Sequence, residues 1–299
     1  MGSKVLAELL VHGDSVRVLV LPESVQKLRY HDRIDVIIGS LEDDEALQKA
    51  VEGVEVVYHF AQRALGARHN PRAFHEVNVF GLENLLRASV PSISRFVFMS
   101  SVQVYSPQPN PNMWPITEGY PRMAHGSPDQ EKYGQSMIDA EDLILRFHRR
   151  HKFAYVILRP TVIYGPGAEF VEELLWEIIN APQLASCRTR HWGPMQWLHV
   201  ADLAEAAVQA GTLPEVANRA FNLAGDESVT LEKITEILQE LAHGSLGREH
   251  HRRYRYRTRF PLKFDTTAAR EQLRFDPKVR LWDGLGQMLA HVTKVPKVA

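Results

Sequence analysis

The sequence predicts an α/β protein in which helices cover both faces of a doubly wound parallel sheet. Short segments rich in β-branched residues alternate with longer helical segments over the first half of the chain. Each short segment is almost continuously apolar, which is typical of parallel strands buried on both faces. The expected strands are 16–21, 34–38, 54–60, 96–100 and 155–159. The expected helices between them are 4–11, 42–51, 78–89 and 135–149.

The pattern changes after Gly165. Expected helices at 169–179, 201–211 and 231–241 alternate with short strand-like pieces, which indicates a smaller C-terminal α/β lobe packed onto the sheet. We therefore predict a sheet domain at 1–165 and a substrate lobe at 166–299, some segments of which return to the sheet. The proline-rich stretch 106–121 is interpreted as a loop over the carboxyl edge of the sheet, where ligands bind in such folds.

Composition narrows the class of protein. The formal net charge is −1, so no global field favours nucleic acid or an anionic membrane as a partner. Cys187 is the only cysteine, which excludes an intramolecular disulfide and fits a reducing compartment. No apolar run approaches the ~20 residues that span a bilayer, and no secretory signal opens the sequence. We expect a cytoplasmic protein without a membrane or nucleic-acid partner and, because its histidines are scattered, without a metal site.

Several motifs occur along most of the chain in one order. They are VYHFA at 57–61, EVNVFGLENLL at 76–86, FVFMSSVQVY at 96–105, RPTVIYGPG at 159–167, WLHVADLA at 197–204, AFNLAG at 220–225 and DTTAAREQL at 265–273. Singly, each has a plain structural interpretation: His59 could be a buried histidine, and Asn78 a helix N-cap. Together, in this order and spacing, they resemble the extended short-chain dehydrogenases/reductases of the NAD-dependent epimerase/dehydratase family.

The resemblance implies a Rossmann-like domain that binds NAD or NADP. Its implied cofactor contacts are Gly2, Ser40, Leu41, Phe60, Ala61, Asn78, Pro160 and Val162. Gly2 would be the last glycine of the family's GxxGxxG turn, so residues 1–299 would lack the first strand and two glycines. In the family strand order 3-2-1-4-5-6, this first strand lies in the middle of the sheet. Two explanations stay open: a fragment, or a folded product whose sheet another segment or a partner chain repairs.

The family chemistry uses a Tyr hydroxyl, a Ser or Thr hydroxyl and a Lys. The Lys lies four residues after the Tyr on the same helix face, where its charge lowers the Tyr pKa and its ammonium holds the nicotinamide ribose. Ser101 and Tyr133 match the two hydroxyl positions, but Met137 stands at the Lys position. Without that charge, a Tyr pKa of ~10 leaves on the order of one molecule in a thousand ionised at pH 7.

Other positions also depart from the family pattern. Val102 and Gln103 replace the acidic pair with which the dehydratases protonate a leaving hydroxyl, so sugar 4,6-dehydration is not expected. The segment 19–22 (LVLP) offers neither an acid for a ribose hydroxyl nor an Arg for a 2′-phosphate. Ser40 replaces an Asp beside the adenine. These departures weaken dinucleotide binding.

Substrate contacts are expected from Gln103, Arg255 and Arg257. The two arginines alternate with tyrosines in the basic segment 248–259, so they share one face of a strand. Guanidinium groups suit diphosphates, and the family often uses arginines of its smaller lobe for a nucleotide-diphosphate sugar. A solvated strand face is the alternative interpretation.

The leading functional prediction is an NAD(P)-dependent epimerase/reductase-family protein with a sugar- or sterol-like small-molecule substrate and degenerate redox catalysis. Whether the chain is an enzyme stays open because of Met137. One alternative is a non-redox isomerase or cyclase that uses Tyr133 and Ser101. Another is a non-catalytic ligand sensor or scaffold. The resemblance also implies a homodimer as one option.

Overall fold

The fold is described from a computed structural model. The structure describes residues 1–28, 30–64, 72–90, 92–105, 115–168, 171–172, 175, 194–243 and 263–294. The expected strands are all present, as β1 (Arg17–Val20), β2 (Asp35–Ile38), β3 (Val56–His59), β4 (Arg95–Met99) and β5 (Ala154–Pro160). The chain is therefore the α/β protein that the sequence predicts. Most of the expected helix 169–179, the loop 106–114, Cys187 and the basic segment 248–259 lie outside the described residues.

The main sheet is parallel and has the order β3-β4-β5-β8. Strand β8 (Arg219–Leu223) comes from the second half of the chain and pairs with β5, Val156 lying opposite Arg219. A separate parallel pair, β1-β2, precedes it in the sequence. A third sheet, with the order β6-β7-β9, contains β6 (Val162–Tyr164), β7 (Met195–His199) and β9 (Ser228–Val229).

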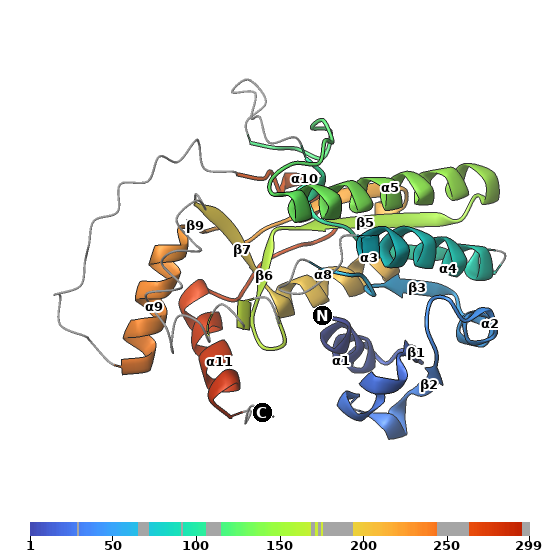
Figure 1. Cartoon of the computed structure of the whole chain (residues 1–299), viewed down its shortest axis with the longest axis horizontal. Helices are drawn as coiled ribbons and strands as arrows, with labels where there is room; N and C mark the ends of the chain where they lie inside the picture. Colours follow the sequence, from blue (N-terminus) through green and yellow to red (C-terminus); the bar gives the residue numbers. More distant parts are fainter. Residues whose placement is uncertain are drawn as a thin grey trace.

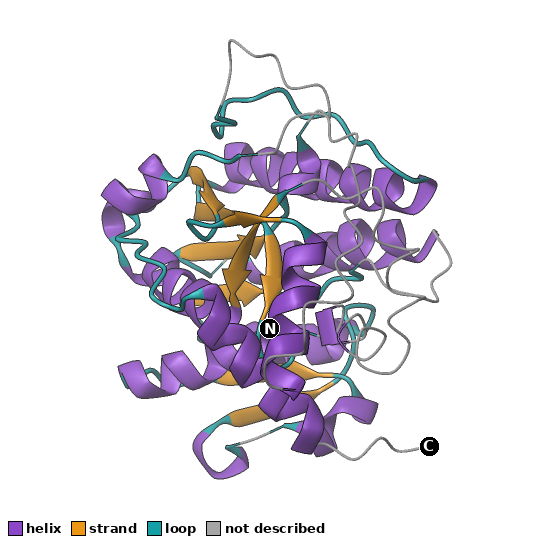
Figure 2. Cartoon of the chain, turned by 90° about the vertical axis from the view of Figure 1, so that its left-hand side faces the viewer, coloured by secondary structure: helices purple, strands orange, loops and turns teal. Residues whose placement is uncertain are grey.

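Helices cover both faces of the main sheet (Figures 1 and 2). Alternation along β4 sends Phe96 and Phe98 to one face and Val97 and Met99 to the other, because successive side chains point to opposite sides. The first face packs against α2 (Asp44–Val51), α4 (Leu82–Ser89) and α5 (Pro128–His151). The second packs against α1 (Gly2–His12), α8 (Val200–Thr212) and α10 (Thr267–Gln272).

The β1–β2 pair and the main sheet lie between the same helix layers but are not joined by strand pairing. Leu19 of β1 and Val57 of β3 both pack on the α2–α4–α5 core, whereas Val56 and Tyr58 face the α1–α8 core. Figure 1 shows the β1–β2 pair set apart from β3. Within the described residues, no strand pairs with the second edge of β1 or with that of β3. The family strand order places a strand at this position.

The smaller sheet packs on two helices of the second half of the chain. These are α9 (Leu231–His243) and α11 (Leu281–Lys294), which form a third core with Tyr164 and Trp197. The boundary of two domains at residue 165 stays a prediction. Among the described helices, none is long and apolar enough to cross a membrane.

Candidate functional site

The two expected catalytic hydroxyls meet at the carboxyl end of β4. Ser101 follows this strand and caps the short 3-10 helix η4 (Val102–Val104), its Oγ accepting a hydrogen bond from the Gln103 amide at 3.2 Å. Tyr133 lies in the first turns of α5, which begins with a capping box between Ser127 and Gln130. The two side chains lie close together, and Ser101 lowers the pKa of the Tyr133 hydroxyl. The structure thus brings together the pair that the sequence predicts.

A glycine makes this close approach possible. Gly134 faces η4, and a Cβ atom on it would lie 2.7 Å from the carbonyl oxygen of Gln103. A side chain there would force α5 and η4 apart, because a Cβ cannot overlap a backbone oxygen. Gly134 therefore lets Tyr133 and Ser101 share one site.

Tyr133 is held as a neutral phenol. Burial raises its pKa to about 12, and the hydrogen bond from Ser101 offsets only part of this rise. Met137, one turn further along α5, is fully buried in the α2–α4–α5 core. A thioether in an apolar core supplies neither a charge for a tyrosinate nor a donor for a ribose hydroxyl.

Gln62 is a member of the site that the sequence did not reveal. The Tyr133 hydroxyl donates to Gln62 Oε1 at 3.3 Å, and Gln62 Nε2 donates to the Met99 carbonyl oxygen at 3.3 Å. The sequence offers one indication that Gln62 belongs to the site. This residue follows β3 at the carboxyl edge of the sheet, where ligands bind in such folds. Its 71-residue separation from Tyr133 hides the contact in the sequence.

Asn78 fixes the loop that carries Gln62. It lies in a π-helical segment, η3 (Glu76–Gly81), and is buried. Its Oδ1 accepts from the Arg63 amide at 2.7 Å, and its Nδ2 donates to the Arg63 carbonyl at 3.2 Å and to Ser136 Oγ at 3.0 Å. The N-cap interpretation of Asn78 is wrong, because the residue lies inside a helix that already begins at Arg72.

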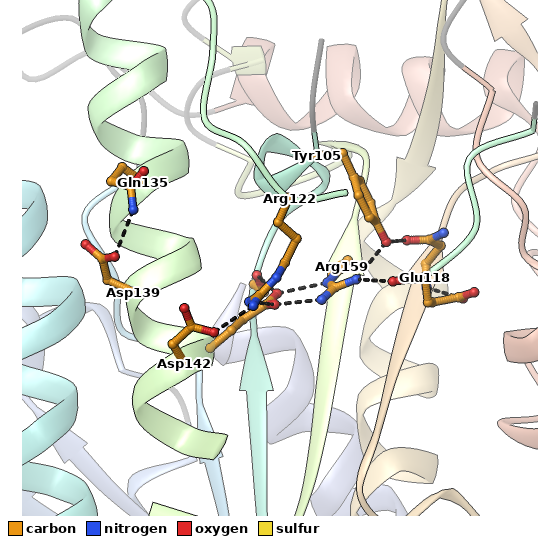
Figure 3. A network of polar contacts seen from close by, with 10 residues as sticks. Tyr105, Glu118, Arg122, Gln135, Asp139, Asp142 and Arg159 are labelled. Atoms are coloured by element: carbon orange, nitrogen blue, oxygen red, sulfur yellow. Dashed lines mark hydrogen bonds and ion pairs between the residues drawn. The ribbon is translucent and has the colours of Figure 1, made fainter. Parts of the chain in front are cut away.

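A buried ion network lies behind the hydroxyl pair. Glu141 of α5 is fully buried and binds Arg159 of β5 through both carboxylate oxygens, at 2.9 and 2.6 Å. The Ser100 hydroxyl donates to the same carboxylate at 2.6 Å, and Arg122 donates at 3.0 Å. Figure 3 shows the two guanidinium groups converging between α5 and β5. The network joins the helix of Tyr133 to the strand that precedes Ser101.

The network continues from Arg159 to β8. Arg159 also donates to the Tyr105 hydroxyl at 2.9 Å, and Tyr105 in turn donates to Asn222. Burial raises the pKa of Tyr105 to about 12, so this phenol also stays neutral. One polar chain therefore ties α5, β5 and β8 beneath the site.

Comparison with known proteins decides the family. A family model described as the NAD dependent epimerase/dehydratase family matches residues 1–224, about three quarters of the chain. The chain belongs to this family. Its parallel sheet, the paired Ser101 and Tyr133 and the order of its motifs agree with that membership.

Individual members of the epimerase/dehydratase family are distant relatives. A dTDP-glucose 4,6-dehydratase of Streptomyces niveus is 28% identical, over 83% of this chain and 72% of its own. Human 3 beta-hydroxysteroid dehydrogenase type 7 is 28% identical, over 56% of this chain and 49% of its own. A UDP-glucuronic acid 4-epimerase from Bacillus cereus, solved in complex with NAD, has a TM-score of 0.77 at 19% identity, covering 98% of this chain and 95% of that one. That likeness shows a shared fold.

The positions expected to contact a cofactor gather mainly at the carboxyl ends of the strands. Ser40 and Leu41 follow β2, the half-buried Phe60 and exposed Ala61 follow β3, Pro160 ends β5 and Val162 opens β6. Gly2 begins α1, and a Cβ on it would meet no atom within 4 Å. Their roles, and that of Gln103, stay predictions. Arg255 and Arg257 lie outside the described residues.

These residues fit the family's dinucleotide poorly. Strand β1 ends at Val20 and is followed by the exposed Leu21 and by Pro22, and none of these side chains can accept a bond from a ribose hydroxyl. The Ser40 hydroxyl already accepts from the Glu42 amide at 3.1 Å. Met137 is buried where the family has its ribose-binding ammonium.

Proposed function

We propose that this chain binds a small molecule at the Ser101–Tyr133 pair and does not carry out the family's ordinary hydride transfer. The buried Met137 carries the proposal. The family's reaction needs a Tyr that gives and takes a proton near neutral pH, and that capacity depends on a positive charge one turn away.

The electrostatics of Tyr133 support this. With a pKa of about 12, on the order of one phenol in 10⁵ is ionised at pH 7. The hydroxyl therefore cannot serve as a base for an alcohol, but it remains a hydrogen-bond partner and a weak acid. Ser101 beside it has the same character.

The substrate class is proposed from the relatives. Their names are those of nucleotide-sugar dehydratases and epimerases and of steroid dehydrogenases. A sugar- or sterol-like molecule with a ring hydroxyl or carbonyl is therefore the proposed ligand, with NAD or NADP as a weakly bound or unused group. A non-redox isomerase that uses Tyr133 and Ser101 as neutral hydrogen-bond partners is the second candidate, because the close approach of α5 and η4 at Gly134 places both hydroxyls in one site.

The test compares wild-type protein with Met137→Lys. Calorimetric titrations with NAD⁺ and NADPH should show wild-type affinity at least tenfold weaker than that of the variant, since a lysine would restore the ribose contact and the charge. Gln135→Lys, on the exposed side of the same helix, is the matched control and should leave cofactor affinity unchanged. Melting temperatures show whether each variant is folded. Tight wild-type binding together with NAD-dependent oxidation of UDP-glucose would contradict the proposal.

A further inference from the structure

We infer that Gln62 sets the direction of the Tyr133 hydrogen bond at this site, so that Tyr133 accepts a hydrogen bond from a ligand hydroxyl instead of donating to a carbonyl. The inference rests on the proposed function, in that a small molecule binds at this pair. It assigns Gln62 as the positioning residue that decides which oxygen chemistry the site selects.

The orientation of the Gln62 amide follows from its two neighbours. The Met99 carbonyl oxygen can only accept a hydrogen bond, so the Gln62 atom 3.3 Å from it is the Nε2 donor. The other end of the amide, Oε1, then faces the Tyr133 hydroxyl at 3.3 Å. An amide oxygen cannot donate, so the proton between them belongs to Tyr133 and points at Gln62.

This direction leaves Tyr133 with lone pairs alone to offer a ligand. Because its proton is used on Gln62, the phenol oxygen can accept a hydrogen bond but has no second proton to donate. Ser101 Oγ, on the neighbouring η4 turn, accepts from the Gln103 amide at 3.2 Å. A ligand at this site therefore meets a phenol oxygen that accepts.

The surroundings hold Gln62 in this arrangement. Asn78 binds both the amide and the carbonyl of Arg63, the residue after Gln62. Asn78 also donates to Ser136 of α5 at 3.0 Å, and Ser136 donates to the Tyr133 carbonyl at 2.8 Å. The loop of Gln62 and the helix of Tyr133 are therefore fixed to one another by buried side chains.

The chemical consequence is a preference for alcohols over ketones. A ligand hydroxyl can donate to the free lone pairs without rearranging the site. A ligand carbonyl offers no proton, so it binds only after the Tyr133 proton has turned from Gln62, which loses a part-buried hydrogen bond.

The first experiment observes the Tyr133 proton directly. In protein labelled at tyrosine ¹³Cζ, a slowly exchanging hydroxyl splits its carbon signal in mixed H₂O and D₂O, and Tyr133→Phe assigns the signal. We expect a split Tyr133 signal in the wild type and a single averaged signal in Gln62→Leu. Gln135→Leu, which removes an exposed glutamine bound to Asp139 on α5, should keep the splitting. A Tyr133 signal that is the same in Gln62→Leu and the wild type would overturn the inference.

The second experiment tests selectivity with cyclohexanol and cyclohexanone. The alcohol should shift the wild-type Tyr133 signal at a severalfold lower concentration than the ketone, and Gln62→Leu should remove or reverse that preference. The inference would be overturned if the wild type responds to the ketone at least as strongly as to the alcohol. It would also be overturned if the wild type responds to neither compound. Wild-type hydride transfer would contradict the proposed function while leaving the measured proton direction as it stands, so the two failures are distinguishable.

Discussion

Glu141 shows at the scale of one residue how the site is held. Its carboxylate is fully buried and accepts hydrogen bonds from Ser100, Arg122 and Arg159. Such a charge is tolerated because each oxygen has charged or polar donors, and removing one member leaves another charge buried without its partner. Asp142, the next residue, binds the same Arg122 at 2.6 Å, but half of its side chain is exposed.

These two acids make a matched pair of substitutions. We expect Glu141→Gln to lower the free energy of unfolding by about 3–5 kcal/mol, because it leaves the buried Arg159 uncompensated. Asp142→Asn should cost no more than about 1 kcal/mol, since exposed ion pairs contribute little. Urea unfolding followed by circular dichroism measures both values. Equal losses would show that the network does not hold the helix of Tyr133.

Individual site residues could be predicted from the sequence where they stand in a motif with a fixed spacing. Tyr133, Ser101 and Met137 could be identified because their motifs resemble those of the family, in which a Lys follows the Tyr by four residues on one helix face. Gln62 and Glu141 could not, since their partners lie 71 and 41 residues away, and only the folded sheet brings them together. An isolated Gln or Glu has no local pattern that marks it as buried.

At the scale of elements, the interruption between β1 and β3 is the main weakness of the fold. Both strands are parallel, and parallel strands are normally paired and covered. Their facing edges lack strand partners among the described residues, although helices cover both sides of the position. Most of the expected strands and helices were confirmed to within a few residues, whereas most of the helix expected at 169–179 lies outside the described residues. The helix expected at 135–149 begins at Pro128, and the helix expected from residue 78 begins at Arg72. Its early part carries little helical periodicity, which is why the sequence did not show it.

Supplying a strand at this position should stabilise the protein. Fusing a five-residue Val- and Ile-rich segment and a glycine turn ahead of Met1 should raise the free energy of unfolding by roughly 2 kcal/mol or more, because each buried branched side chain contributes about 1.5–3 kcal/mol before entropy losses. A Gly-Ser fusion of equal length is the control. If thermal and urea unfolding give the two fusions the same stability, the position between β1 and β3 does not accept a strand.

At the scale of the whole molecule, the parallel sheet gathers the site along one edge. Residues that follow β2, β3, β4 and β5 all lie at carboxyl ends, which is where such folds bind ligands. The order of motifs along the chain therefore predicted the fold and the edge of the sheet at which these residues gather. It could not predict the hydrogen-bond directions, because these depend on the Met99 carbonyl and the Asn78 clamp.

Burial by the whole fold also sets the chemistry of Tyr133. The unfolded chain should give its phenol an ordinary pKa of ~10, against about 12 in the folded protein. A raised pKa means that the folded state favours the neutral form. Its contribution to stability is therefore complete below about pH 10 and disappears as the pH rises through about 12.

The ¹³Cζ signal of Tyr133, followed against pH in folded protein and in denaturant, tests the central claim most directly. We predict that the folded signal keeps its neutral position through about pH 10 and titrates with a midpoint of about 12, whereas the unfolded signal titrates near ~10. A folded midpoint at or below about 8 would mean that some group replaces the missing lysine charge. That result would contradict the account of Tyr133 as a neutral hydroxyl without hydride-transfer chemistry.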